Sequence, residues 1–297
     1  DWNDRTVIFA QPGETIHFTY DVPEDFVVTK EEWLWYFAYT DGHGSFGSGS
    51  NDDEYGATHF ESYTYEPTGI HVEWDGKGSI SLSANEMVRI QLRLNGYEYL
   101  YAYVLVADPA EYYTYEIQNG EATITGYNKE LLRSKVLIPE EIEGYPVTSI
   151  GDRAFYAMPS GIGQRFYIPD TVTTFGEEAF ASSPYLDAVR MPQKLTKMGE
   201  GVFAACLQMY FLDIPDSLTE IPDYAFVNCW VYGYAKNYSV ENCIGKNVTK
   251  IGKGAFAGCW NMGKDWGEGR LPEKLESIGE GAFQYCYKIK SLEIPAG

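Results

Sequence analysis

Four histidines are the side chains best suited to acid–base chemistry near neutral pH in this chain of 297 residues. They are His17, His43, His59 and His71. No two of them have the spacing of the paired-histidine motifs that bind catalytic zinc. The sequence also contains no nucleophile elbow of a hydrolase, no phosphate-binding loop and no dinucleotide-binding fingerprint. We therefore predict no catalytic residue and no cofactor, and we expect that the chain is not an enzyme.

Carboxylates are plentiful, with 43 Asp and Glu against 22 Lys and Arg, so any one acidic pair says little about catalysis. The densest group is Asp52, Asp53 and Glu54, in the glycine-rich segment 41–56. Calcium prefers several oxygen ligands of this kind, but the spacing matches no calcium loop. A flexible, solvated turn is the favoured interpretation, with calcium binding as the alternative, and we predict no metal site.

The five cysteines are Cys206, Cys229, Cys243, Cys259 and Cys286. They include no closely spaced pair of the kind found in zinc sites. All except Cys243 follow a phenylalanine by three residues. We interpret these four as buried free thiols that act as small hydrophobic side chains. A disulfide between neighbouring copies stays an alternative, because equivalent positions in stacked repeats lie close together.

The net charge of −21 argues against nucleic acid and anionic membrane surfaces as partners, since both attract clustered Lys and Arg. The longest apolar run, 99–107, is far shorter than the roughly 20 residues that a membrane-spanning helix needs, so we predict no membrane insertion within this chain. Two thirds of the excess negative charge lies in residues 1–110, which contain 5 Lys or Arg and 19 Asp or Glu. This asymmetry supports a domain boundary near residue 110.

A ten-residue phrase recurs in the second part of the chain, in five clear copies and a looser one. The copies are SIGDRAFYAM (149–158), TFGEEAFASS (174–183), KMGEGVFAAC (197–206), EIPDYAFVNC (220–229), KIGKGAFAGC (250–259) and SIGEGAFQYC (277–286). Between them lies a short phrase that ends in an apolar residue and usually proline, such as LDIP at 212–215. The apolar residue precedes the next Phe by 12 positions in five consecutive units, whereas the return distance varies.

Each half of the unit has its own periodicity. Leu212 and Ile214 alternate with Asp213, as in a half-buried strand, and the proline after them ends strand pairing. Phe283 and Cys286 are three residues apart, as on one face of a short helical turn. A single unit cannot cover its apolar face, so stacked copies must bury one another. We predict a solenoid of about six units over 147–297, preceded by a lead-in capping segment at 111–146.

The repeat resembles the BspA-like (Treponema-type) bacterial leucine-rich repeats, most clearly in LTKMGEGVFAACLQMYFLDIP at 195–215. The stretch 115–155 is similar to the hairpin-like segment that opens such arrays. The resemblance implies a curved right-handed solenoid on secreted or surface proteins of bacteria, used for adhesion and partner binding. Met158 and Ser183 replace the usual cysteine, Pro222 replaces the usual glycine, and the fourth and fifth units are longer than usual.

Residues 1–110 contain no such repeat. Seven stretches show strand-like alternation: 15–20, 33–40, 60–65, 70–74, 79–83, 87–94 and 97–106. The Asn-Gly pair between the last two is a hairpin signal. Without an amphipathic helix, this pattern predicts an all-β, immunoglobulin-like antiparallel sandwich. The fold class is therefore a multidomain chain, with this sandwich followed by the leucine-rich-repeat solenoid, and we expect the junction at 107–113.

Two surfaces of the solenoid are candidates for partner binding. On the strand face, the alternation places these residues outward: Leu137, Tyr167, Arg190, Asp213, Cys243, Arg270 and Glu293, with Arg165 and Phe211 beside them. The long fourth and fifth units bring a second group together at one edge: Trp230, Tyr232, Tyr234, Tyr238, Trp260 and Trp266. These types dominate binding hot spots. The alternatives are an ordinary solvated face, and aromatic rings that only hold long loops down.

We interpret the chain as a non-enzymatic interaction or adhesion protein, extracellular or on a bacterial cell surface, that binds a protein partner such as a host or matrix protein through its solenoid. The alternative is a carbohydrate-binding protein that stacks sugar rings on exposed Trp and Tyr. The sequence ends directly after a strand phrase, without the polar closing unit that a solenoid needs. We therefore expect that the natural chain continues or that another chain covers this end.

Overall fold

The computed structural model describes residues 5–10, 15–18, 31–38, 70–74, 78–82, 87–95, 97–132, 135–163, 165–209, 214–229, 244–262 and 269–295. The chain divides into two compact units, Asp1–Tyr112 and Tyr113–Gly297. The domain limits expected at residues 110 and 146 describe parts that fold independently. Compactness alone does not test independent folding, so these limits stay a prediction.

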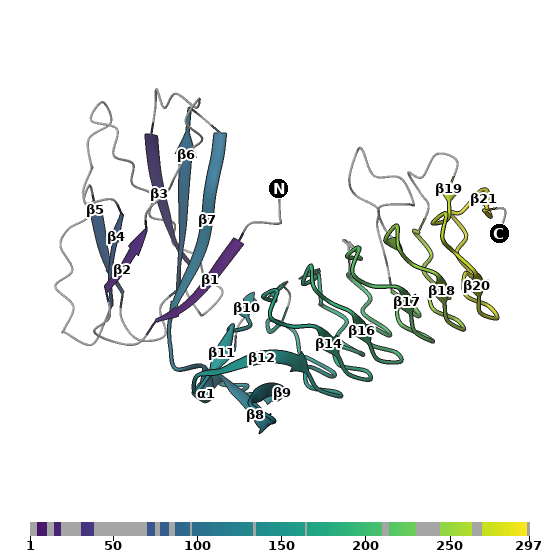
Figure 1. The fold of residues 1–297 in the computed structure, drawn as a ribbon, viewed down its shortest axis with the longest axis horizontal. Helices are drawn as coiled ribbons and strands as arrows, with labels where there is room; N and C mark the ends of the chain where they lie inside the picture. Colours follow the sequence, from purple (N-terminus) through teal and green to yellow (C-terminus); the bar gives the residue numbers. More distant parts are fainter. Residues whose placement is uncertain are drawn as a thin grey trace. The chain divides into compact units, whose positions relative to one another are not determined.

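The first unit contains seven described strands and one short helix. They are β1 (Arg5–Ala10), β2 (Thr15–Phe18), β3 (Glu31–Ala38), β4 (Ile70–Trp74), β5 (Gly78–Leu82), β6 (Met87–Leu94), β7 (Tyr97–Val106) and α1 (Pro109–Tyr112). One sheet has the order β1-β7-β6-β3, and a second sheet has the order β2-β4-β5 (Figure 1). The sequence analysis did not predict β1.

The hairpin expected at the Asn-Gly pair is confirmed, because β6 and β7 pair antiparallel with Leu94 opposite Tyr97. Asn95 adopts a φ of 53°, as the primed two-residue turns of hairpins require. However, β1 is parallel to β7 and β2 is parallel to β4, so the expectation of purely antiparallel sheets is wrong. The stretch 60–65 lies outside the described residues. An immunoglobulin-like sandwich therefore stays a prediction.

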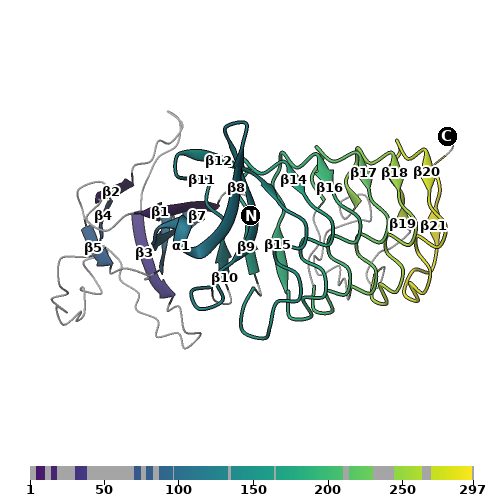
Figure 2. The ribbon, with the colours of Figure 1, turned by 90° about the horizontal axis from the view of Figure 1, so that it is seen from below.

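The second unit is a solenoid built from short strands. These are β8 (Tyr113–Gln118), β9 (Glu121–Tyr127), β10 (Lys135–Leu137), β11 (Glu141–Ile142), β12 (Tyr145–Ile150), β13 (Arg165–Tyr167), β14 (Thr174–Phe175), β15 (Ala188–Arg190), β16 (Lys197–Met198), β17 (Glu220–Ile221), β18 (Lys250–Ile251), β19 (Gly269–Arg270), β20 (Ser277–Ile278) and β21 (Leu292–Glu293). Successive units lie in line, which Figures 1 and 2 show from two directions.

Two parallel ladders run along this stack. The first joins the apolar phrases, with β10, β13 and β15 in order and β19 beside β21. The second joins the strands that precede the turn, in the order β16-β14-β12-β9-β8, and continues as a separate sheet β17-β18-β20. The β8–β9 hairpin opens the second ladder, since β9 pairs parallel with β12. The predicted leucine-rich-repeat solenoid is confirmed, and the lead-in hairpin is its first layer.

The core of the solenoid is a column of phenylalanine rings, one from each unit. Successive ring centroids are 5.0–5.5 Å apart, and neighbouring planes lie within 12° of parallel, through Phe155, Phe180, Phe203, Phe226, Phe256 and Phe283. The Tyr127 ring of β9 stacks on Phe155 at 5.6 Å and begins the column. Burying each ring contributes about 1.5–3 kcal/mol, which a unit gains only against its neighbours.

Beside this column runs a second column of cysteines, which are free and buried as the sequence predicted. Their role exceeds that of small hydrophobic side chains, because each thiol donates a hydrogen bond to the phenylalanine carbonyl of the preceding unit. The sulfur–oxygen distance is 3.2 Å from Cys206 to Phe180 and 2.9 Å from Cys229 to Phe203. Ser183 donates in the same way to Phe155 over 3.0 Å, which explains why serine can replace cysteine there.

The turn that carries each phenylalanine is not helical, which corrects the expectation of a short helical turn. In the second repeat of the solenoid, Phe180 N–H donates to the Val202 carbonyl of the next repeat over 2.9 Å. By contrast, Ala181 N–H donates to the Glu178 carbonyl within the same turn over 3.0 Å. In an α-helix, every N–H after the first four donates to the carbonyl four residues earlier in the same segment. The alternation instead directs every second N–H along the stack, so the turns form a third hydrogen-bonded ladder.

Glycine precedes this turn because adjacent units approach very closely there. A Cβ on Gly252 would lie 2.5 Å from the Asp223 nitrogen and the Pro222 carbonyl carbon, too close for any side chain. The glycine N–H also bonds to the preceding unit, as from Gly252 to Ile221 over 2.8 Å. Pro222 has no N–H to donate, and the sheet is interrupted between β16 and β17, the strand that Pro222 follows.

Candidate binding surfaces of the solenoid

The strand face differs from the prediction at two positions. Leu137 and Tyr167 were expected to point into solvent, but each side chain is only 2% exposed, so that expectation is wrong. They occupy neighbouring strands in register, and Tyr167 is in turn opposite Arg190, so large side chains shield one another. Arg190 is half-buried. The backbone of Arg270 lies in β19, opposite Glu293 of β21.

The insertion edge is described at only one of its predicted residues. Trp260 is 60% exposed, as a partner-binding side chain requires. The other residues predicted for this edge lie outside the described part of the chain: Trp230, Tyr232, Tyr234, Tyr238 and Trp266. Phe211, Asp213 and Cys243 of the predicted strand face also lie outside it. The predicted approach of Trp260 to the aromatic residues of 230–243 therefore stays a prediction.

An exposed apolar column, which the sequence analysis did not single out, includes Trp260. The residue directly after the cysteine position is Leu207 in the third unit, Trp260 in the fifth and Tyr287 in the sixth. These side chains are 47%, 60% and 70% exposed. We call these three residues the corner column. The sequence signal was available, because the position is fixed by its distance from the column of phenylalanines.

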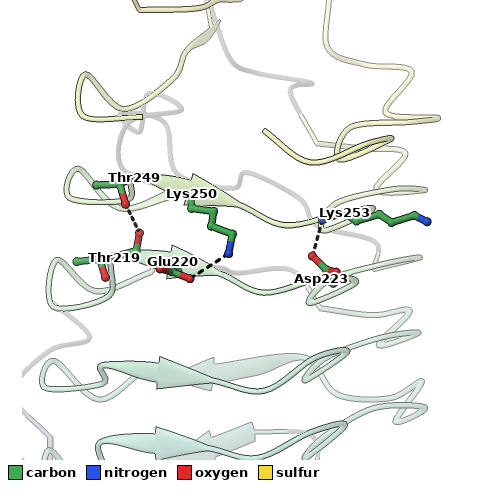
Figure 3. A network of polar contacts seen from close by, with 6 residues as sticks. All are labelled: Thr219, Glu220, Asp223, Thr249, Lys250 and Lys253. Carbon is green, nitrogen blue, oxygen red and sulfur yellow. Dashed lines mark hydrogen bonds and ion pairs between the residues drawn. The ribbon is translucent and has the colours of Figure 1, made fainter. Parts of the chain in front are cut away.

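Polar contacts join adjacent repeats at the strands that precede the turn, as Figure 3 shows for β17 and β18. Between the fourth and fifth units, Thr249 Oγ1 donates to the Thr219 carbonyl over 3.2 Å, and Lys253 N–H donates to Asp223 Oδ1 over 2.7 Å. Lys250 Nζ lies 3.5 Å from Glu220 Oε2, and both side chains are more than half exposed. Such exposed ion pairs contribute about 0–1 kcal/mol, so this face maintains register more than it adds stability.

The buried thiols are not suited to nucleophilic chemistry. Burial raises the pKa of the Cys206 and Cys259 thiols well above the usual value, and it raises the pKa of Cys286 to about 11. At neutral pH these groups are therefore protonated, whereas the reactive species is the thiolate. Within the described ranges, no three His, Cys, Asp or Glu side chains are grouped so that they could hold a metal ion.

The repeat pattern matches a known family over more than half of the chain. The model for the BspA type leucine rich repeat region matches six copies, over residues 135–232 and 231–297. The chain belongs to the BspA-type leucine-rich-repeat family. The resemblance inferred from the repeated phrases is thus confirmed, and the matched residues coincide with the units that carry the phenylalanine and cysteine columns.

Solved structures of bacterial leucine-rich-repeat proteins are similar to this BspA-type chain. A crystal structure of a leucine-rich-repeat protein from T. pallidum is 25% identical, with a TM-score of 0.52, and the match covers 62% of this chain and 80% of that one. A leucine-rich cell-surface protein from Faecalibacterium prausnitzii is 23% identical (TM-score 0.43; 61% of this chain and 52% of that one). A leucine-rich-repeat protein from Bacteroides ovatus is 24% identical (TM-score 0.47; 62% and 52%).

This BspA-type chain therefore spans about half the length of two of these three proteins. No curated protein sequence matches the chain significantly. Among the described residues, no helix combines the length and the apolar character needed to cross a membrane.

Proposed function

We propose that this chain is a non-enzymatic interaction protein, secreted or displayed on a bacterial cell surface, that binds a protein partner through its BspA-type solenoid. The location follows from the resemblance to repeats that occur on such proteins. The partner class is a host or matrix protein. The observation that carries the proposal is the corner column, which exposes large apolar side chains on a rigid scaffold.

The exposed apolar side chains of the corner column recur at one position of the repeat. Singly exposed apolar residues are normal on a protein surface, but Trp260, which is 60% exposed, and Tyr287, which is 70% exposed, occupy the same position in consecutive repeats. Trp and Tyr are enriched among the residues that dominate binding energy at interfaces. The rings stand on repeats whose backbone is held by stacked phenylalanines, so little backbone conformational entropy would be lost when a partner binds.

The test compares binding of the full chain and of a Leu207→Ala, Trp260→Ala double variant to fractionated matrix proteins by surface plasmon resonance. The matched control is Tyr185→Ala, which removes another surface tyrosine that is 39% exposed. We expect the double variant to weaken binding by at least about tenfold, and the control to change it less than about twofold. If both variants bind equally well, the corner column is not the binding surface.

The second candidate is carbohydrate binding through exposed Trp and Tyr, as the aromatic composition suggests. The two functions are separated by treating the captured matrix fraction with glycosidases before the measurement. Binding to a protein surface survives this treatment, whereas binding to its glycans is lost.

A further inference from the structure

A groove lies on the outer edge of the turns of the fourth, fifth and sixth units. Its volume is about 520 Å³, within the range of small-ligand sites, which is about 300–1,000 Å³. Its floor is the fifth unit, where Gly254 and Gly258 expose the backbone on either side of Ala257. Its side-chain walls come from the two flanking units and from the charged residues at one end: Tyr224, Asn228, Lys253, Glu280, Gln284 and Tyr285.

The groove exists because two turn positions lack side chains. The position occupied by Gly254 and Gly281 has a positive φ in all six repeats. In the first and second repeats it holds Arg153 and Glu178, with φ of 54° and 50°. The backbone therefore accepts larger residues at this position. A Cβ on Gly254 would lie 2.8 Å from the Tyr224 ring, so glycine here leaves room for that ring to lie across the fifth unit.

Two tyrosines from different units line the groove. Tyr224 belongs to the fourth unit and Tyr285 to the sixth, and the phenylalanine columns beneath them advance by 5.3 and 5.5 Å per unit. Tyr285 is 57% exposed and lies 6.1 Å, centroid to centroid, from Tyr287 of the corner column. Aromatic rings in such positions offer flat apolar faces to a ligand.

The polar groups of the groove suit an uncharged ligand that has many hydroxyl groups. Asn228 and Gln284 supply amides, each of which both donates and accepts hydrogen bonds. Lys253 Nζ lies 3.9 Å from Glu280 Oε2, so the one positive and one negative side chain of the lining balance each other. A side-chain hydrogen bond with Tyr224, together with the Glu280 carboxylate, raises the pKa of Lys253, so its ammonium is a constant donor at neutral pH.

The backbone of the groove is not available to pair with an extended peptide. Tyr224 N–H donates to the Lys253 carbonyl over 2.8 Å, and Gly254 N–H donates to Glu280 over 3.0 Å. Asn228 N–H and Gly258 N–H bond in the same way to the next unit. A peptide that binds by strand addition needs a free edge, which these turns do not offer. Recognition in this groove must therefore come from side chains.

We propose that this groove binds a neutral saccharide, with a pyranose ring seated between Tyr224 and Tyr285 and its hydroxyl groups bonded to Asn228, Gln284 and the Lys253–Glu280 pair. Acidic sugars are disfavoured by the net charge of −21 of the chain. Tyr287 of the corner column borders the site through Tyr285, whereas Leu207 and Trp260 are not among the lining residues, so the Leu207→Ala, Trp260→Ala variant that tests protein binding leaves the saccharide site unchanged.

The test is electrophoresis of the full chain in native gels that contain mannan, xylan, β-glucan or galactan, with polygalacturonate as the acidic probe. We expect at least one neutral polysaccharide to retard the chain. Calorimetric titration with an oligosaccharide of that polymer then measures the effect of Tyr285→Ala and Asn228→Ala, each expected to weaken binding by about tenfold. Tyr185→Ala is the matched control and should bind like the unchanged chain.

Both test variants are compatible with the backbone. The equivalent position in the first and third units holds Ala157 and Ala205, with φ of 53° and 59°, so alanine already occurs in this left-handed conformation. Unchanged thermal unfolding of the variants confirms that they fold, and Gln284→Ala is an additional variant whose backbone is unaffected. The proposal is overturned if no neutral polysaccharide retards the chain, if only polygalacturonate does, or if all three variants bind as tightly as the control.

Discussion

At the scale of single residues, Cys206 occupies its position because of its hydrogen bonds as well as its size. Its thiol donates to the Phe180 carbonyl over 3.2 Å, and its sulfur accepts the Ser183 N–H from the preceding unit. Ser183 makes the equivalent pair of bonds, since it donates to Phe155 and accepts the Met158 N–H. Cys206 and Ser183 therefore both donate and accept a hydrogen bond at the same buried position of two consecutive repeats.

We predict that Cys206→Ala destabilises the solenoid by about 1–3 kcal/mol, because the buried Phe180 carbonyl loses its thiol donor. Cys206→Ser keeps a donor and an acceptor, as Ser183 does, and should cost less than about 1 kcal/mol. Urea unfolding of the full chain, followed by circular dichroism, measures both values. Equal stability of the alanine and serine variants would mean that the position needs only a small side chain.

At the scale of secondary-structure elements, the described strand ladder is broken between β16 and β17. The glycine N–H that bridges adjacent units is absent at Pro222, although the turn ladder continues there through Phe203 N–H and the Ala225 carbonyl, 2.9 Å apart. The third and fourth units thus remain joined by their turns and by the stacked rings of Phe203 and Phe226. Only the strand side is weakened.

We predict that Pro222→Gly joins β16 to β17, because the new N–H can donate to the Met198 carbonyl. Hydrogen exchange of the Glu220 and Ile221 amides should slow by about threefold or more, as expected for an added hydrogen bond of about 1 kcal/mol. Global stability should change by less than about 1 kcal/mol, since loss of the proline ring offsets this gain. Pro215→Gly is the control, and exchange slowed equally by both variants would contradict the explanation.

At the scale of the whole molecule, the repeat spacing was sufficient to predict the stacked phenylalanines. Because 12 residues separate the apolar strand residue from Phe180, Phe203, Phe226, Phe256 and Phe283, equivalent backbone positions had to coincide. The same reasoning failed for Tyr167, since alternation in a strand of three residues does not reveal what covers the outer side. It also failed to identify the thiol hydrogen bonds, because a sequence pattern does not show which carbonyl a buried side chain meets.

The groove was beyond sequence reasoning for a different reason. It is defined by missing side chains at Gly254 and Gly281 as much as by the tyrosines, and its residues come from three units. The corner column could have been found by reading the residue after each cysteine position. In residues 1–112, the parallel pairing of β1 with β7 was not predicted, because alternation indicates a strand but not the direction of its partner.

We predict that residues 113–297 fold without residues 1–112. The β8–β9 hairpin pairs with β12, and Tyr127 covers the first phenylalanine ring, so this end of the solenoid has a cap of its own. The isolated segment should show the same hydrogen-exchange protection at Phe180, Phe203 and Phe226 as the full chain. Rapid exchange at these amides would mean that residues 1–112 are required for folding.

The even advance of 5.0–5.5 Å per phenylalanine ring fixes the distance between successive repeats at the core of the solenoid. Substitutions at outer positions change which chemical group is displayed, and they leave this core spacing unchanged. The surface residues of the solenoid can therefore vary while the distance between its repeats stays constant.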